Sequence, residues 1–412
     1  MTKLVSKRGF SICRGCESGN LVSVLNLGDQ PLPAEYGINA DDVLDKFPLH
    51  LRICRDCGLG QLGEYVLPSR IFHDNYPYLS SASDYWLNHS KNFAREMCDK
   101  LTLNSNSLVM ELASNDGYLL SEFKKYGIPV IGVEPTKNTA NIARAAGIPT
   151  ISKFFGQELA KKLLKEYGHP KLIVANNVYA HIPDMQDFTK GMAVLADDNT
   201  IVTIENPSFD ILISNAFFDT IYHEHYSYLT AHSVNAVVKK FGLTLFHIDR
   251  LPTHGGSNRY YLSRSLKPDE TVKVVLDEEK KSGLFNENKW KDFAACSKKN
   301  IIELRQWFME QESMGNRVVG YGAAHKGNTF LNAVGEASRT LKYVVDASKE
   351  KQGKFLPGSQ IPVLAPEHLN SIDPTDVLIL PWNIAEELTV KIKSLAPNAR
   401  IWIAQPSMKQ IK

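Results

Sequence analysis

The chain has 412 residues, about two to three times the length of a typical single domain, so we expect two or three domains. Hydrophobic residues make up 43% and charged residues 22%, and no stretch approaches the roughly 18 to 20 consecutive apolar residues of a membrane-spanning helix. The formal charge of +2, from 47 basic and 45 acidic residues, argues against nucleic acid or a membrane surface as partner and favours a small molecule.

The first residues, MTKLVSKRGFSICRGC, lack the roughly 7 to 15 residue apolar core of a signal peptide, so we expect a cytoplasmic protein with reduced thiols. Cysteines then occur in two pairs, Cys13 and Cys16 in CRGC, and Cys54 and Cys57 in CRDC. This spacing lets both thiolates of a pair point at one metal ion, and two pairs complete a tetrahedral shell. The reducing cytoplasm disfavours two disulfide bonds, and a redox-active dithiol would need only one pair of cysteines. We predict a structural zinc ion in a module over residues 1–70.

From Ser107 the pattern SLVMELASNDGYLLSEFKKYGIPVIGVEP predicts a βαβ unit whose second strand ends in Glu134. An acid at that place can accept hydrogen bonds from ribose hydroxyls. The first turn contains only Gly117, whereas a nicotinamide-binding fold normally has three glycines there. A later strand, from Leu172 to Ala175, is followed by Asn176 and Asn177, at the edge of the sheet where ligands bind. Capping of the next helix is the alternative role for these two side chains. We predict an α/β domain over residues 71–265.

The stretch YHEHYSY begins at Tyr222 and is unusually rich in titratable and phenolic side chains. His223 and His225 are two residues apart, so they would share a face of a strand but diverge on a helix. A zinc-peptidase helix needs two histidines four apart, so metal binding is disfavoured. The density of reactive groups predicts an active site. The alternative is that the histidines are structural residues whose ring nitrogens are hydrogen-bonded. Next, in PTHGGSNRYYLSR, Arg259 or Asn258 could meet a carbonyl or phosphate, although a hairpin turn explains this motif equally well.

A third α/β region is predicted over residues 266–412. RVVGYGAAHKGNTF reads as a strand, a turn with Gly320 and Gly322, and a helix, and Lys326 adds a charge that suits phosphate. A packing turn without a ligand is an equal alternative. The last segment, from Thr375 onwards, supplies two more strands and a helix that would close a parallel sheet.

Taken together, the motifs resemble one family. The two cysteine pairs, YPYLSSAS, ELASNDGYLL, NVYAHIPD, IENPSF, YHEHYSYLT, PTHGGSNRYYLSR and GYGAAHKGNTFLN follow the order found in the S-adenosylmethionine-dependent sugar C-methyltransferases. The first methyltransferase motif departs from the common glycine-rich form. The resemblance runs from about Cys13 to the C-terminus. It implies a small zinc-binding module, a central class I (Rossmann-like) methyltransferase domain and a C-terminal Rossmann-like α/β domain that binds the nucleotide sugar.

The family methylates carbon 3 of nucleoside diphosphate 4-keto deoxysugars. The resemblance implies His225 as the base, with His223 as the alternative, Tyr222 and Glu224 as groups that hold the hydroxyl and enolate, and Tyr76 and His181 as further candidates. The cofactor contacts that it implies are Ser80, Ser83, Glu111, Ala113, Asn115, Gly117, Tyr118, Leu119, Glu134, Asn176, Asn177 and Val178. The implied substrate contacts are Asn206, His223, Arg259, Tyr321, Lys326, Asn328, Ser348, Lys351 and Lys354.

Three other functions stay open at this point. One is methyl transfer to oxygen or nitrogen of a small metabolite, which needs a base but no enolate stabilisation. Another is a nicotinamide-dependent dehydrogenase or epimerase that uses the turn at 320–327. The third is a zinc-ribbon protein for nucleic acid, against which the near-zero net charge counts. A monomer is expected, and the sequence leaves open which sugar and which nucleotide base the substrate carries.

Overall fold

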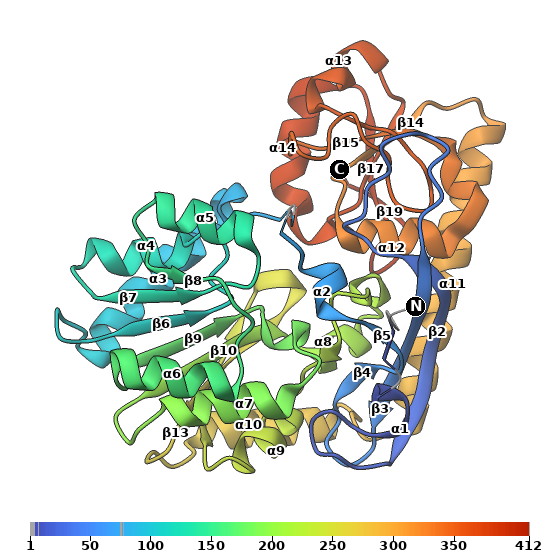
Figure 1. The fold of residues 1–412 in the computed structure, drawn as a ribbon. Helices are drawn as coiled ribbons and strands as arrows, with labels where there is room; N and C mark the ends of the chain where they lie inside the picture. Colours follow the sequence, from blue (N-terminus) through green and yellow to red (C-terminus); the bar gives the residue numbers. More distant parts are fainter. Residues whose placement is uncertain (1–4, 7, 75, 77, 412) are drawn as a thin grey trace.

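The computed structural model describes residues 5–6, 8–74, 76 and 78–411 (Figure 1). Residues 1–4 of the predicted N-terminal module and Pro77 of the YPYLSSAS motif lie outside this range. The chain forms a central lobe around a seven-stranded sheet, a second lobe around a six-stranded sheet, and an N-terminal four-stranded sheet that lies along both lobes. Within the described part of the chain, every helix is too short or too polar to cross a bilayer.

The central sheet is mostly parallel. Its strands, in spatial order, are β12 (Thr244–Leu251), β13 (Ser257–Ser263), β10 (Ile201–Pro207), β9 (Leu172–Asn176), β6 (Val109–Leu112), β7 (Val130–Val133) and β8 (Thr150–Ile151). Only β13 is antiparallel to its neighbours. The chain order reverses between β6 and β9, and ligands of open α/β sheets bind at the carboxyl ends of strands beside such a reversal.

Helices cover both faces of this sheet, which explains why all four residues of β6 and of β7 are buried. One face packs on α6 (Gln157–Tyr167) and α7 (Met185–Leu195), and the other on α3 (Asp84–Leu101), α4 (Tyr118–Lys125) and α5 (Lys137–Ala145). Local signals fix the helix starts: the Ser83 side chain accepts from the Trp86 amide at the start of α3. The expected class I fold is confirmed.

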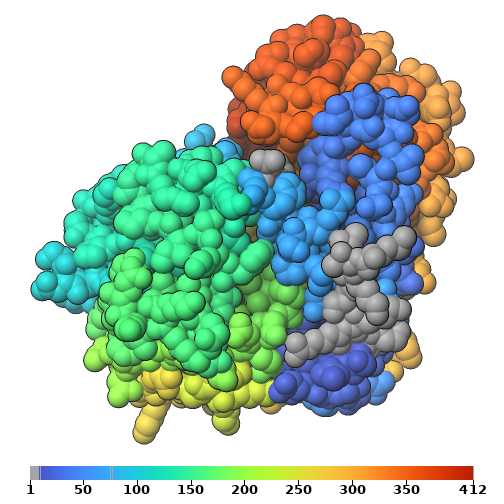
Figure 2. Space-filling model, in the orientation of Figure 1, coloured from blue at the N-terminus to red at the C-terminus, as the bar shows by residue number. Residues whose placement is uncertain are grey.

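The N-terminal sheet contains a strand from the middle of the chain. Its order is β11 (Ser227–Tyr228), β4 (Gly60–Leu62), β3 (Lys46–Cys54) and β2 (Leu21–Pro31), all antiparallel. The loop between β2 and β3 reaches the C-terminal lobe, where Gly37 and Phe355 exchange two backbone hydrogen bonds of 2.9 Å. In Figure 2 the blue N-terminal atoms accordingly border both the green and the orange parts of the molecule.

After β13 the chain forms α10 (Glu270–Lys281), which packs on the central lobe through Val272 and Val275. The C-terminal lobe begins with the long helix α11 (Glu287–Ser313). Its sheet contains, in spatial order, β16 (Val363–Leu364), β15 (Leu341–Val345), β14 (Val318–Tyr321), β17 (Asp376–Ile379), β18 (Arg400–Ile403) and β19 (Lys409–Ile411). The last strand is antiparallel to β18, so the predicted parallel sheet is in fact mixed. Helices α12 (His325–Val334) and α14 (Ala385–Leu395) follow β14 and β17.

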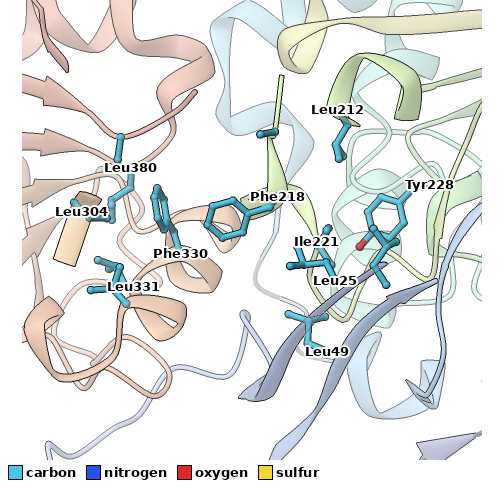
Figure 3. Close-up of a cluster of buried hydrophobic side chains, with 14 of the residues drawn as sticks. Leu25, Leu49, Leu212, Phe218, Ile221, Tyr228, Leu304, Phe330, Leu331 and Leu380 are labelled. Carbon is cyan, nitrogen blue, oxygen red and sulfur yellow. The ribbon is translucent and has the colours of Figure 1, made fainter. Parts of the chain in front are cut away.

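One hydrophobic cluster joins all three parts (Figure 3). It includes Leu25 and Leu49 of the N-terminal sheet, Phe218 and Ile221 of the central lobe, and Phe330 of α12. The Phe218 and Phe330 rings meet edge to face with centroids 4.9 Å apart. Because these side chains are buried against one another, the hydrophobic effect favours one fixed arrangement of the three parts over independent domains.

Candidate active site and metal centre

The four paired cysteines lie together. Their sulfur atoms are all within 4.8 Å of one another, with 3.6 Å between Cys13 and Cys57 and 3.5 Å between Cys16 and Cys54. Thiolates bound to one tetrahedral zinc ion at about 2.3 Å lie about 3.8 Å apart, so this set fits zinc and leaves no open coordination position. The Lys240 ammonium donates to the Cys16 carbonyl at 2.9 Å, which ties the first pair to the central lobe. The predicted structural zinc site is confirmed.

The predicted cofactor loops adopt unusual backbone conformations at the carboxyl ends of β6 and β9. Ala113, Asn115 and Asn177 have φ of 59°, 48° and 52°, in the left-handed region that residues other than glycine seldom occupy. Gly117 starts α4 with φ of 80°, and a Cβ there would lie 3.1 Å from Ala143 and Ile148. Such conformations concentrate at ligand sites, where the surrounding structure maintains them.

Buried acceptors surround these loops. Glu111 is 1% exposed and Asp116 is 5% exposed, and among the described residues neither Glu111 Oε2 nor Asp116 Oδ1 has a hydrogen-bond partner. Burial, and then the charges of Asp116 and Glu134, raise the pKa of Glu111 well above its usual value. S-adenosylmethionine carries an ammonium group, two ribose hydroxyls and a sulfonium charge, so an acidic pocket with free acceptors fits it.

Glu134, the predicted ribose contact, also holds the loop. Its carboxylate accepts the Asn115 amide at 2.9 Å and the Thr136 amide at 2.8 Å. The segment with Ser80 covers the same loop, because the Ser80 amide donates to Asn115 Oδ1 at 2.9 Å. The Ser83 hydroxyl is used as the cap of α3. The cofactor loop is therefore closed by a segment that is distant in sequence.

Four other predicted cofactor residues, Tyr118, Leu119, Asn176 and Val178, lie in or beside the loops that follow β6 and β9. Leu119 is fully buried and Val178 is 6% exposed, and both side chains belong to hydrophobic clusters. Both side chains belong to the core of the central lobe, and their contact with the cofactor stays a prediction. Tyr118 is also mostly buried, and burial raises its pKa well above the usual value. Asn176 is the last residue of β9, and its buried Oδ1 has no hydrogen-bond partner among the described residues.

The predicted catalytic residues come together. Tyr222 donates its hydroxyl hydrogen to His225 Nε2 at 2.8 Å, and His225 Nδ1 lies 3.2 Å from the Thr220 carbonyl oxygen. A carbonyl can only accept, so these partners assign the proton to Nδ1 and leave the lone pair on Nε2. The His181 ring packs edge to face on His225 at 4.9 Å. The His225 ring is thus held with Nδ1 protonated and with Nε2 accepting from the Tyr222 phenol.

Glu224 links this group to two other segments. Its carboxyl accepts from the Tyr76 hydroxyl at 2.8 Å and lies 3.5 Å from His325 Nδ1. Phe72 packs against both Tyr76 and His181, with ring centroids 5.5 Å and 5.7 Å away. The sequence reasoning missed His325, which comes from the C-terminal lobe. His325 lies next to Lys326 in the turn that was predicted to bind phosphate, so no local pattern indicated its contact with Glu224.

Electrostatics favour an unprotonated base. Burial, and then the neighbouring His181, His254 and Lys326, lower the pKa of His225 well below its usual value. Burial and the Glu224 carboxyl raise the pKa of Tyr222, so the phenol stays protonated. At neutral pH the pair is a neutral imidazole beside a hydroxyl donor, which suits proton abstraction next to a carbonyl whose oxygen gains negative charge.

Two predicted substrate contacts lie elsewhere. His223 is 1% exposed, and its Nε2 lies 3.0 Å from the Phe47 carbonyl of β3, so this ring serves the contact with the N-terminal sheet. Arg259 is 2% exposed, and its Nε and Nη2 donate to Glu205 at 3.2 Å and 2.9 Å. The guanidinium is thus engaged in a buried ion pair, and a contact of Arg259 with the substrate stays a prediction. Asn206 does line a small cavity with His225.

The remaining candidates surround the turn after β14. Lys326 donates to Asn383 at 2.8 Å, and Lys351 donates to the Ala323 carbonyl at 3.0 Å. Asp346 accepts the Ala323 amide at 2.7 Å, so that amide is not free for a phosphate. Tyr321 packs in the core of the lobe, which makes it a structural residue. Asn328, Ser348 and Lys354 lie on α12 or in the loop after β15.

A class I fold with buried carboxyl groups beside its cofactor loops defines a methyltransferase that uses S-adenosylmethionine. Family models match a zinc binding domain at residues 13–72, a methyltransferase domain at 87–248 and a C-methyltransferase C-terminal domain at 252–405. The C-methyltransferase NovU of Streptomyces niveus is 30% identical over 396 residues, which cover 95% of this chain and 94% of the relative. The chain belongs to the C-methyltransferase family.

Solved structures match the central lobe only distantly. Magnesium protoporphyrin IX methyltransferase from Synechocystis with bound SAH is 14% identical, with a TM-score of 0.34, over 43% of this chain and 83% of that chain. A SAM-dependent methyltransferase from Anabaena variabilis is 15% identical, with a TM-score of 0.36, over 46% of this chain and 88% of that chain. Family membership removes the oxygen or nitrogen methyltransferase, nicotinamide and nucleic-acid alternatives.

Proposed function

We propose that this enzyme methylates carbon 3 of a nucleoside diphosphate 4-keto deoxysugar. The observation that carries the proposal is the hydrogen-bonded pair of His225 and Tyr222, next to the buried Glu224. Methylation at carbon needs a carbanion equivalent, and the proton beside a ketone is the one that a neutral imidazole can remove. Methyl transfer to oxygen would not require a second group that stabilises an enolate.

The steps follow from the hydrogen bonds. Before the reaction the Tyr222 hydroxyl must turn from His225 Nε2 to the ketone oxygen of the substrate, which frees the Nε2 lone pair. His225 Nε2 then takes the proton from carbon 3, the electron pair of that C–H bond forms the enolate, and the phenol donates to the enolate oxygen. Glu224, held by Tyr76, is placed to accept from a sugar hydroxyl. S-adenosylmethionine, when bound, would supply an electrophilic methyl group: its methyl–sulfur bond would break as the bond to carbon 3 forms, and the sulfur would leave as the neutral thioether of S-adenosylhomocysteine.

The C-terminal lobe is proposed to hold the nucleotide diphosphate. Lys326 and Lys351 lie at the turn after β14, at the carboxyl edge of a sheet whose order reverses between β14 and β17. Asn328 is 2% exposed, and its Oδ1 has no hydrogen-bond partner within the described ranges. His325, next to Lys326, reaches Glu224, so a substrate bound at this turn lies beside the catalytic group.

A matched pair of substitutions tests the base. His225→Gln should reduce turnover of a nucleoside diphosphate 4-keto deoxysugar by a factor of about 100 or more, because it removes the proton acceptor. S-adenosylmethionine binding, measured by calorimetry, should stay unchanged. His223→Gln, two residues away, keeps a donor for the Phe47 carbonyl and should retain most activity. Loss of activity in the second variant alone would move the base to His223, and a product with the methyl on oxygen would overturn the proposal.

A further inference from the structure

The loop that carries the base is anchored by the C-terminal lobe. Trp382 lies in a 3-10 turn (Trp382–Ile384) after β17, and its Nε1 donates to Asp219 Oδ2 at 2.8 Å. Phe217 packs on the same indole with centroids 4.2 Å apart, and Phe218 packs on Phe330 (Figure 3). Asp219 is fully buried, so its carboxylate depends on this partner.

Asp219 is the neighbour of the residue that orients the base. The carbonyl of Thr220 accepts from His225 Nδ1, and that contact assigns the proton to Nδ1. Phe218, Asp219 and Thr220 form one 3-10 turn, in which the Ile221 amide donates to the Phe218 carbonyl at 2.9 Å. The Asp219 side chain and the Thr220 carbonyl therefore belong to one short hydrogen-bonded turn, next to each other in the chain.

Trp382 itself has little freedom. Gly255 has φ of 87°, and a Cβ at this position would lie 2.9 Å from Trp382 Cη2, so the indole is packed against the turn between β12 and β13. The Lys326 ammonium lies 4.8 Å from the centroid of the same indole and donates to Asn383, the next residue. The indole therefore contacts the base loop, the central lobe and a lysine of the proposed nucleotide turn.

We propose that Trp382 and Asp219 are positioning residues, through which the C-terminal lobe holds the Thr220 carbonyl and so the orientation and tautomer of His225. This rests on the proposed role of His225 as the base. A purely structural role for the same contact would stabilise the fold without setting the tautomer. The two roles differ in what they do to the histidine itself, so they can be separated by experiment.

Trp382→Phe removes the N–H donor and keeps an aromatic ring on Phe217. Trp402→Phe is the matched control, because Trp402 Nε1 donates to Asp376 at 2.7 Å in the same lobe but contacts no residue of the base loop in the hydrogen bonds and ring contacts of the described chain. With zinc-loaded full-length protein, Trp382→Phe should lower kcat about tenfold, as one lost hydrogen bond does, and leave KM within about twofold. Trp402→Phe should leave both unchanged.

A readout that needs no substrate decides the matter. Nitrogen-15 NMR of labelled histidines reports the tautomer of His225, whose signal is assigned by its absence in His225→Gln. Trp382→Phe and Asp219→Ala should shift this signal from the Nδ1-protonated form towards a mixture, and Asp219→Asn, which keeps an oxygen acceptor, should restore part of it. An unchanged tautomer with a lower melting temperature would overturn the proposal. If His225→Gln retains full turnover, the base assignment fails instead, whatever the NMR shows.

Discussion

Arg259 offers a sharp test, because its sequence motif predicted a substrate contact and the structure gives it another role. Its side chain is 3% exposed and pairs with Glu205, which is fully buried, and the His89 ring lies 2.9 Å from the same carboxylate. Although burial opposes it, hydrogen bonds and charge from His89 and Arg259 lower the pKa of Glu205 below its usual value. The carboxylate is thus ionised, and Arg259→Met would leave it with His89 alone.

Removing one partner of a buried ion pair typically costs about 3–5 kcal/mol, a large part of a total stability of about 5–15 kcal/mol. Urea unfolding at pH 7, followed by tryptophan fluorescence with zinc present, should show this loss. The control is Arg250→Met, whose exposed pair with Glu278 should contribute less than about 1 kcal/mol. Adding Glu205→Gln to Arg259→Met should recover most of the loss, because no buried charge remains. An unchanged unfolding midpoint with a raised KM would refute this reasoning and return Arg259 to the substrate.

Two further predictions concern the base and the metal. The pKa of His225 is lowered, and the base must be unprotonated, so kcat/KM should stay level as pH falls from 8 and be lost only below about 6.5. Lys326→Met removes a positive charge near His225, so the pH at which kcat/KM is lost should rise in this variant. If the wild-type enzyme already loses kcat/KM above pH 6.5, the assignment of His225 as the base is contradicted. Cys54→Ser should lose zinc, measured by metal analysis, and lower the melting temperature, since structural zinc contributes folding free energy. A zinc-free variant that melts like the wild type would count against this role.

Features set by neighbours in sequence could be predicted. The spacing of Cys13 and Cys16 requires only a local turn, and two such turns suggest their shared ion. The strand that ends before Glu134 follows from an apolar run and its flanking turns. His225 was predicted as the base through a resemblance, and the structure adds the tautomer, which depends on Thr220 and Tyr222 five and three residues away.

Features set by distant pairing could not be predicted. Arg259 and Glu205 lie on adjacent antiparallel strands 54 residues apart, and the motif around Arg259 gave no sign of its partner. His223 was placed in the site because it is a neighbour of His225, but its ring bonds to β3. The pairing of β11 with β4 places the residues that follow the base in the zinc module's sheet, and no local pattern indicates it. Such contacts depend on the register of whole strands and on the packing of lobes, which a single sequence does not display.

Proton exchange at carbon 3 tests the central claim most directly. The enzyme and a nucleoside diphosphate 4-keto deoxysugar are mixed in heavy water without a methyl donor, and deuterium at carbon 3 is followed by proton NMR. We predict that wild-type protein and His223→Gln exchange this proton faster than the uncatalysed rate, and that His225→Gln does not. No exchange by the wild-type protein, or equal exchange by His225→Gln, would contradict the account.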